Sequence, residues 1–344
     1  MIEYVSLRHF RNHRNEQFNL TDKVFIQGEN GAGKTSLLEA LYYVSLLKSH
    51  RTSDDSALIM YDKPYAKITL KTSNHLYEVV IQRDKKHLSL DKVTIKKMSQ
   101  FIGGYKVIIF SPEDLELIKG MPRIRRQFLD IEMFQINPHY MEKLTTYKQV
   151  LNQRNALLKR LSLSDDRTFL NILTQRLSLE ASYIIKERQR FIHALNKAFK
   201  SRFKHLNEVD KVEVIYEPNT PINALEDTFK TRLERDILSK TTNSGPHRDD
   251  FMILFNQKPA KEFASQGQQR LMAIALKLAI IDLIKDKEVV ILLDDILSEL
   301  DDEKQLKIEH LFNLGKQVII TGTNNPFEIN TIQLKEGIKY GTKQ

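Results

Sequence analysis

The sequence of 344 residues contains no cysteine, no long apolar run and no apolar leader at its amino terminus. Without cysteine the chain can form no disulfide, no thiolate nucleophile and no cysteine-ligated zinc site. The longest apolar run, LLEALYYVSLL, has 11 residues and includes Glu39, whereas a membrane-spanning helix needs roughly 20. The first residues, MIEYVSLRHFRN, place Arg8 and Arg11 where a signal peptide would be apolar. These absences predict a soluble, cytoplasmic protein that is not inserted in a membrane.

The composition is that of a globular protein with a moderate basic excess. Apolar residues make up 41% of the chain and charged residues 28%, and the net charge is +9. A basic excess of this size is compatible with nucleic-acid binding, but many basic proteins bind no anion. No helix-turn-helix, zinc-finger or RRM motif is visible, so any DNA binding is expected to be independent of base sequence.

The pattern of apolar residues divides the chain into three segments. Strand-like runs occur near both ends, including alternating apolar and polar residues over 65–95. Between 112 and about 206 apolar residues recur instead at helical spacing. The length also favours two domains. We therefore predict one α/β head domain interrupted by a helical second lobe, with the head formed by residues 1–111 and 241–344 and the lobe by residues 112–240.

The stretch GENGAGKT matches the phosphate-binding motif G-x-x-x-x-G-K-[ST], between a predicted strand and a predicted helix. Glycines let consecutive backbone N–H groups point at a phosphate chain, and the helix amino terminus adds a positive field. Lys34 is expected to contact the β- and γ-phosphates of ATP, and the Thr35 hydroxyl to bind Mg²⁺. The predicted nucleotide-binding residues of this loop are Gly28, Glu29, Asn30, Gly31, Ala32, Gly33, Lys34, Thr35 and Ser36.

Two aspartates follow a wholly apolar run near the carboxyl end, in VVILLDDILSELDD. The run is typical of a buried parallel strand, and ligands bind α/β sheets at the carboxyl ends of such strands. Asp294 is therefore the predicted Mg²⁺ ligand and Asp295 the residue that orients or deprotonates the attacking water. An alternative is that the two acids cap the next helix, although Ser298 and Asp301 already form a plausible capping pair.

The stretch ASQGQQRL precedes an apolar-periodic segment and contains no titratable acid, thiol or histidine. Its position predicts a helix amino terminus, where a hydroxyl and free backbone N–H groups make an anion site. The predicted phosphate contacts are Ser265, Gln266 and Gly267, with Ser265 in a catalytic role. The alternative is an ordinary serine N-cap.

The order of these three motifs resembles that of ABC-type ATPase heads. The chain is more closely similar to the RecF family of bacterial recombination and repair ATPases, in the SMC-like group. The matching stretches are FRNH (10–13), GENGAGKTSLLEALY (28–42), KSHRT (48–52), FSPEDLELIKGMPRIRRQFLD (110–130), GPHRDD (245–250), SQGQQR (265–270) and LLDDILSELDD (292–302).

This resemblance implies an ATPase head with a helical second lobe and a slow DNA-dependent ATPase activity. It implies an ATP-driven homodimer, in which the Ser265 turn closes over the nucleotide of a second subunit. The expected ligands and partners are ATP, Mg²⁺, duplex DNA, single-strand gap junctions and mediator proteins that help to load a recombinase. Arg11 and Asn12 are expected near the base or ribose. ABC heads often carry a glutamine after the strand ending in VIIF and a switch histidine near IITGTN, but this chain has neither, and Thr321 and Thr323 are the candidates for the second position.

Two basic clusters are candidates for DNA phosphate contacts, which supply most sequence-independent affinity. They contain Lys48, Arg51, Arg123, Arg125 and Arg126. The alternative is that these cations face solvent or form ion pairs within the protein. In GPHRDD, Arg248 is likewise expected either to bind an anion or to be neutralised by Asp249 or Asp250.

Other P-loop proteins were weighed against this interpretation. A P-loop kinase or GTPase acting on a small substrate has no need of the Ser265 turn, and no guanine-reading motif is evident. A structural SMC or zinc-hook ATPase requires long coiled-coil arms or cysteines, and the middle segment of about 130 residues is too short for such arms. An ABC transporter subunit is disfavoured by the helical insertion and by GPHRDD.

Overall fold

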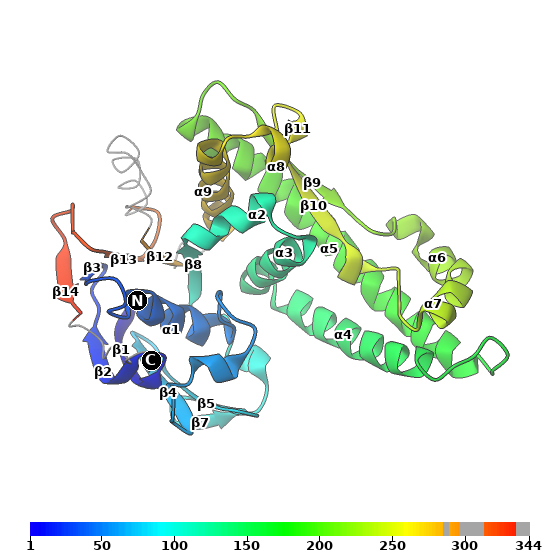
Figure 1. Ribbon diagram of the computed structural model, residues 1–344, viewed down its shortest axis with the longest axis horizontal. Helices are drawn as coiled ribbons and strands as arrows, with labels where there is room; N and C mark the ends of the chain where they lie inside the picture. Colours follow the sequence, from blue (N-terminus) through cyan, green and yellow to red (C-terminus); the bar gives the residue numbers. More distant parts are fainter. Residues whose placement is uncertain (285–288, 296–312, 335–344) are drawn as a thin grey trace, which may run out of the picture. The chain divides into compact units, whose positions relative to one another are not determined.

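The computed structural model describes residues 1–284, 289–295 and 313–334. The chain divides into two compact units (Figure 1). Unit 1 combines Met1–Glu113 with Ile284–Gln344, and unit 2 is Asp114–Leu283. Among the described residues no helix has both the length and the apolar character needed to cross a bilayer.

A five-stranded parallel sheet carries the motifs of unit 1. Its order is β14 (Asn330–Gln333), β3 (Lys23–Gln27), β13 (Gln317–Gly322), β12 (Val289–Leu293) and β8 (Lys106–Phe110). All residues of β12 and β13 are buried, as expected for parallel strands covered on both faces. Because the strands are parallel, the residues that follow β3, β12 and β13 lie at one edge of the sheet.

An antiparallel sheet forms the rest of the β-structure of unit 1. Its order is β2 (His13–Asn19), β1 (Ile2–Phe10), β4 (Tyr65–Thr72), β5 (Leu76–Gln82), β6 (Lys86–Leu90) and β7 (Val93–Ile95). Buried and partly exposed residues alternate along β4 and β5, which follows the two-residue period of a strand with one buried face. The predicted hairpin region over 65–95 corresponds to β4 to β7.

Helix α1 (Lys34–Leu46) packs against both sheets of unit 1. It is therefore buried on nearly all sides, and only Thr35 and Ser36 of its 13 residues are not buried. A helix that is apolar around its whole circumference belongs in such a position. The phosphate loop thus leads from the interior strand β3 into a helix that is fixed by the core.

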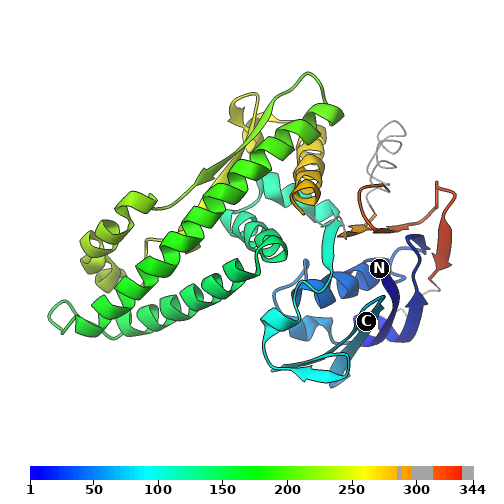
Figure 2. The same cartoon turned by 180° about the vertical axis from the view of Figure 1, so that it is seen from behind.

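Unit 2 is mainly helical (Figures 1 and 2). Its α-helices are α2 (Glu116–Lys119), α3 (Pro122–Ile136), α4 (Pro138–Leu158), α5 (Thr168–Leu206), α6 (Leu225–Thr231), α7 (Leu233–Ser239), α8 (Ala260–Phe263) and α9 (Gln266–Leu283). A small antiparallel sheet has the order β11 (Lys258–Pro259), β10 (Asp250–Phe255), β9 (Val212–Glu217). Helix α5 packs against α4, α9 and β9.

Both units contain short 3₁₀ helices. They occur at Asp55–Leu58, Met98–Gln100, Pro112–Leu115, Ile222–Ala224 and Pro246–Arg248.

The second boundary of the helical segment differs from the predicted one. The prediction returned the chain to the head at residue 241, whereas residues 241–283 belong to unit 2. The reason is that β10 pairs with β9, from Asp250 opposite Glu217 to Phe255 opposite Val212, and that α9 packs against α5. The β-texture after residue 241 therefore belongs to a sheet inside unit 2, and the Ser265 turn belongs to unit 2 as well.

Two buried arginines bind the segments of unit 2 together. Arg188 on α5 donates to Asp130 at 2.8 Å, to the carbonyl of Pro246 at 2.7 Å and to Asp249 at 3.1 Å. Arg154 on α4 donates to Asp236 at 2.9 Å. Removing one member of such a buried pair leaves an uncompensated charge, at a cost of about 3–5 kcal/mol. The Arg188 contacts hold the GPHRDD segment against α3 and α5, and the Arg154 pair joins α4 to α7.

Candidate nucleotide-binding site

The phosphate loop requires glycine at two positions for conformational reasons. Gly31 and Gly33 have φ angles of 87° and 103°, a region that other residues rarely adopt. Gly33 is also closely surrounded, because a Cβ there would lie 2.8 Å from the amide nitrogen of Asn12 and from the ring of His13. The loop is thus fixed by its own backbone and by neighbouring side chains.

The Lys34 ammonium group lies within the loop that it is predicted to serve. It donates to the carbonyl of Gly28 at 2.9 Å and to that of Glu29 at 3.2 Å, and Lys34 is only 4% exposed. Lys34 is the first residue of α1, where the helix dipole also favours an anion. The loop therefore concentrates positive charge at the place where a phosphate chain would lie.

His13 supports the loop, although the sequence analysis did not single it out. One ring nitrogen lies 3.1 Å from the carbonyl oxygen of Gly33, and the other lies 2.6 Å from Glu16. The ring is buried, and these two contacts fix its orientation. Asn12 donates to the Gly31 carbonyl at 3.2 Å, so the FRNH segment contacts the loop from outside. The one available sequence signal for His13 was its position in the FRNH stretch.

Thr35 and Asp294 meet at the carboxyl edge of the parallel sheet. The Thr35 hydroxyl donates to an Asp294 carboxylate oxygen at 3.0 Å, although the two residues are far apart in the sequence. Two adjacent oxygen ligands of an octahedral Mg²⁺ ion, each bonded at about 2.1 Å, lie about 3.0 Å apart. The two residues therefore fit the predicted metal as neighbouring ligands.

The pKa of Asp294 is raised to about 6, mainly because the carboxyl group is buried. Hydrogen bonds from Thr321 and Thr35 oppose this shift, and the nearby charges of Asp295 and Glu113 add to it. A divalent cation would reverse the balance, because a metal ligand must be deprotonated. The sequence analysis had not named Glu113 as a neighbour of this site.

Thr321 joins the two acids. Its hydroxyl donates to Asp294 at 2.9 Å and accepts from the backbone N–H of Asp295 at 3.0 Å. Thr321 is fully buried and positions both acids, whereas Thr323 is exposed. Asp295 has a φ angle of 49°, an uncommon conformation that frequently occurs at functional sites. Ser298 and Asp301, the alternative capping pair, lie outside the described residues.

Arg11 is tied into the wall of unit 1. Its guanidinium group donates to both carboxylate oxygens of Glu39 on α1, each at 2.8 Å. Arg51 lies 4.0 Å from the same carboxylate. Burial alone would raise the pKa of Glu39, but hydrogen bonds from Arg11 and Ser49 hold it below its usual value. The Glu39 carboxylate thus connects the segments FRNH and KSHRT to α1. It accepts hydrogen bonds from Arg11 and forms an ion pair with Arg51.

The Ser265 turn forms a capping box at the amino terminus of α9. The Ser265 hydroxyl oxygen accepts from the backbone N–H of Gln268 at 3.3 Å, and the Gln268 side chain accepts from the backbone N–H of Ser265 at 2.8 Å. This is the reciprocal pattern of S-x-x-Q. Ser265, Gln266 and Gly267 are exposed, and a Cβ on Gly267 would meet no atom within 4 Å. The serine N-cap predicted as the alternative is therefore present, and it leaves the serine proton free to donate outward.

The predicted DNA contacts in PRIRRQ have partners inside unit 2. Arg125 donates to both oxygens of Asp250 at 2.8 and 2.7 Å, and Arg126 donates to the carbonyl of Asp249 at 2.7 Å. Asp249 also pairs with Arg188. Other arginines thus contact both carboxylates, and the alternative that these aspartates neutralise Arg248 stays a prediction. Arg123 and Lys48 are exposed, and their role in DNA binding stays a prediction.

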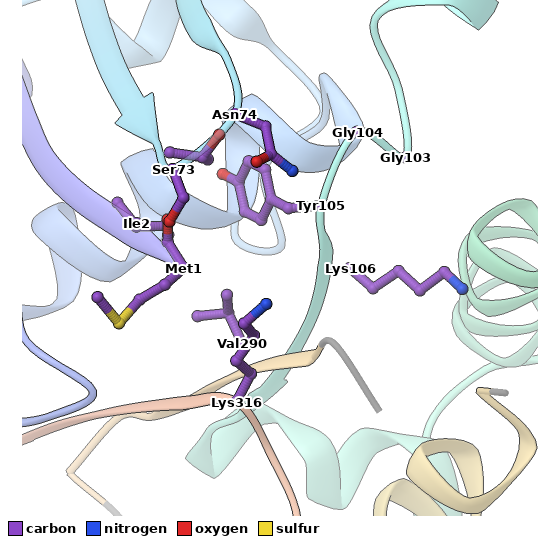
Figure 3. Close-up of a pocket in the computed structure, with 11 residues that line it drawn as sticks. Met1, Ile2, Ser73, Asn74, Gly103, Gly104, Tyr105, Lys106, Val290 and Lys316 are labelled. Carbon is purple, nitrogen blue, oxygen red and sulfur yellow. The ribbon is translucent and has the colours of Figure 1, made fainter. Parts of the chain in front are cut away.

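A pocket of unit 1 lies at the end of the parallel strands opposite the phosphate loop and Asp294. This cavity of about 340 Å³ is lined by Met1, Asn74, Tyr105, Lys106, Val290 and Lys316, among others (Figure 3). Lys106, Val290 and Lys316 lie at or next to the amino ends of β8, β12 and β13. Figure 3 shows the Lys106 side chain extending away from Met1 and Asn74. Ligands of open α/β sheets bind at the other edge, where the phosphate loop and Asp294 are.

Comparison with known proteins agrees with this geometry. The family model described as "RecF/RecN/SMC N terminal domain" matches residues 1–338. The chain is 42% identical to "DNA replication and repair protein RecF" of Acholeplasma laidlawii, over 98% of both sequences. It is 39% identical to the protein of the same name from Bacillus cytotoxicus, over 94% of this chain and 92% of that one.

Solved structures give the same result. The structure described as recombination mediator protein RecF-ATP in the RecFOR pathway has a TM-score of 0.91 and 28% identity, and the match covers 98% of this chain and 96% of that one. An Smc head domain from Pyrococcus furiosus has a TM-score of 0.56 at 16% identity, which indicates a shared fold alone. The fold is that of an ABC/SMC-type P-loop ATPase head, as predicted, and the chain belongs to the RecF family.

Proposed function

We propose that this chain is an ATP-dependent DNA-binding protein of recombinational repair and replication. In this proposal two copies dimerise when ATP and Mg²⁺ are bound between the phosphate loop of one copy and the Ser265 turn of the other, and the dimer binds duplex DNA and single-strand gap junctions in the cytoplasm. Slow, DNA-dependent hydrolysis of ATP ends the dimeric state. The RecF relatives are described as repair and replication proteins and as mediators of the RecFOR pathway, which supports a role in loading a recombinase with partner proteins.

The observation that carries the proposal is the contact between Thr35 and Asp294 beside Lys34. A hydroxyl on the phosphate-loop helix and a carboxylate after β12 lie 3.0 Å apart, at the edge of the sheet where such folds bind nucleotides. When bound, Mg²⁺ would neutralise charge on the phosphates. Lys34 and the loop N–H groups would hold and orient those phosphates.

The acids after β12 have different environments, which supports different roles. Asp294 is 3% exposed, whereas Asp295 is partly exposed and its backbone N–H is held by Thr321 at 3.0 Å. We assign Asp294 to the metal and Asp295 to the attacking water, which it would orient or deprotonate. An aspartate at this position is one methylene shorter than the glutamate of ABC heads.

The exposed Ser265 turn supports completion of the site by a second copy. Its hydroxyl proton and the first N–H groups of α9 are directed at no acceptor among the described contacts of this turn, and helix amino termini attract phosphate. The neighbouring Gly267 has open space around it, so an approaching subunit could come close to the backbone. We therefore place the γ-phosphate of one copy against the Ser265 turn of the other.

Sedimentation of Asp295→Asn tests the proposal. The amide should keep ATP binding but slow hydrolysis, so that the variant accumulates as an ATP-bound dimer with Mg²⁺ and DNA. Lys34→Ala is the matched control that should bind no ATP and remain monomeric in the same buffer. A purely monomeric Asp295→Asn with bound ATP would overturn the dimer model. If Ser265→Ala retained both dimerisation and hydrolysis, the site would instead resemble that of a P-loop kinase or GTPase.

A further inference from the structure

One exposed face of α5 carries a row of basic side chains along the second half of the helix. The positions are separated alternately by four and three residues, a spacing that keeps them on one side of an α-helix. All of them are exposed: Lys186, Arg190, His193, Lys197, Lys200 and Lys204. At 1.5 Å per residue the row is about 27 Å long. Figure 2 shows α5 extending along unit 2, and we call these positions the α5 basic row.

Few acids neutralise the α5 basic row. Residues 188–206 contain no aspartate or glutamate. Arg190 pairs with Glu187 at 2.6 Å, and Lys200 pairs with Glu213 on β9 at 2.6 Å. Within the described part of the chain, the other three lysines of the row form no ion pair. The exposed face of the helix therefore has a net positive charge along its length.

The packed side of the same helix behaves differently. Arg188 is buried and pairs with Asp130 and Asp249, and Arg202 donates to Asp282 on α9 with its Nε at 2.7 Å. Cations that contribute to folding thus have carboxylate partners from other elements. Within the described residues Lys186, Lys197 and Lys204 have no such partner, unlike Lys200 with Glu213, so the charges of these three lysines can be removed without disturbing the packing of α5.

The composition of the row favours nucleic acid over protein as its partner. Cores of protein interfaces are depleted in lysine and enriched in aromatic residues, yet four of the six positions are lysine. The aromatic residues of this half of α5, Phe191, Phe199 and Phe203, are all buried. Exposed large apolar residues of α5 occur only in its first half, at Phe169, Ile172 and Leu179.

The absence of exposed Phe, Tyr and Trp side chains also favours duplex over single-stranded DNA. Proteins that bind single strands stack bases on exposed aromatic side chains, and the α5 basic row contains no Phe, Tyr or Trp. A rigid row of about 27 Å equals about eight base-pair steps of 3.4 Å along a duplex. We propose that the α5 basic row binds the phosphate backbone of duplex DNA, without reading base sequence. This inference rests on the proposed DNA-binding function and adds the surface that carries it.

The test compares two variants that lose the same charge. The row variant carries Lys186→Gln, Arg190→Gln, Lys197→Gln and Lys204→Gln. The control variant carries Lys85→Gln, Lys92→Gln, Lys96→Gln and Lys97→Gln, at exposed positions of unit 1. Glutamine has nearly the helix propensity of lysine and arginine, so α5 should fold in both. Binding of a labelled random-sequence duplex of about 30 base pairs is measured with ATP and Mg²⁺ over about 50–300 mM salt, so that the salt slope can be compared.

The logarithm of affinity should fall less steeply with salt for the row variant than for the wild type. The difference should approach about 0.9 per phosphate contact, or about 3.6 for four contacts. At moderate salt the row variant should bind about tenfold or more weakly. Its affinity for a single strand of equal length should change less than its affinity for the duplex.

Equal slopes for the row variant and the wild type would overturn the inference and assign the α5 basic row to solvent or to a protein partner. An equal loss in both variants would also overturn it, because the effect would then be one of total charge. Sedimentation of the same samples measures ATP-driven dimerisation. It therefore distinguishes failure of this inference from failure of the proposed function. A wild type that dimerises with ATP but binds no duplex contradicts the DNA-binding part of the proposed function and this inference together.

Discussion

The phosphate loop and the Ser265 turn are both helix amino termini that can bind phosphate, but they are constrained in opposite ways. Gly33 is enclosed by Asn12 and His13, and Lys34 is held by carbonyls of its own loop. Gly267 has open space around it, and the turn around it is exposed. The loop is therefore specified by contacts within unit 1. The turn is not enclosed by its own chain, and this openness is the reason for our proposal that it contacts a second copy.

The comparison can first be sharpened at the helix that carries the turn. Lys277 of α9 pairs with Asp114 at 2.8 Å. Both charges affect the pKa of the buried Glu132 of α3. Burial, with Asp114 adding to it, raises the pKa of Glu132 to about 7, against the opposing effects of Lys277 and Gln135. Folded unit 2 therefore retains a proton on Glu132 at a pH where the unfolded chain releases it.

This pKa shift predicts that Glu132 lowers stability as pH rises. The stabilising contribution of the protonated Glu132 carboxyl group is fully present below the ordinary pKa of about 4.5, and it is lost as pH rises through about 7. Glu132→Gln, which mimics the protonated group, should raise the free energy of unfolding by up to about 3 kcal/mol at pH 8 and by little at pH 5. Urea denaturation of both proteins at the two pH values measures the difference. An equal effect at both would mean that the group does not titrate as described.

A second prediction addresses the enclosed glycine. Gly33→Ala forces a side chain into a backbone with φ of 103° and into contact with Asn12 and His13 at 2.8 Å. We expect a loss of about 2 kcal/mol of stability, together with loss of ATP binding because the loop N–H groups move. Thermal unfolding with and without ATP measures both effects. Unchanged stability would show that the loop is less constrained than its contacts indicate.

Gly267→Ala is the matched substitution on the open side of the comparison. Alanine meets no atom within 4 Å there and suits a helix better than glycine, so stability should stay the same or rise by about 0.5–1 kcal/mol. ATP-driven dimerisation should nevertheless weaken, because the methyl group stands where a second subunit would approach. Denaturation and sedimentation together check this separation. A variant that loses stability would contradict the open environment of Gly267.

Local sequence predicted the elements that carry the nucleotide site. The apolar run at 289–293 and the glycine pattern at 28–35 depend only on neighbouring residues, and both correspond to β12 and to the phosphate loop. The contact between Thr35 and Asp294 could be expected because parallel strands present their carboxyl ends at one edge. Whether these residues bind Mg²⁺ and ATP stays a prediction.

Other features depend on pairings between distant segments and could not be predicted from local patterns. Arg125 and Arg126 were candidates for DNA contacts, with ion pairs inside the protein as the alternative, and the fold brings Asp249 and Asp250 to them. Sequence alone does not show which carboxylate reaches a given arginine. The boundary at residue 241 was misplaced for the same reason, because β9 and β10 form a sheet inside unit 2. His13 was not predicted, because its contact with the Gly33 carbonyl joins two segments that are 20 residues apart in the sequence.

The central claim is that each nucleotide site is completed by a second copy, and mixing two inactive variants tests it most directly. Lys34→Ala removes the phosphate loop's ammonium group and keeps the Ser265 turn, whereas Ser265→Ala does the reverse. Neither alone should show ATP-driven dimerisation or DNA-dependent hydrolysis. In a mixed dimer the intact loop of one copy faces the intact turn of the other. The account predicts that mixing restores dimers and measurable hydrolysis; a mixture that remains as monomeric and inactive as its components would contradict it.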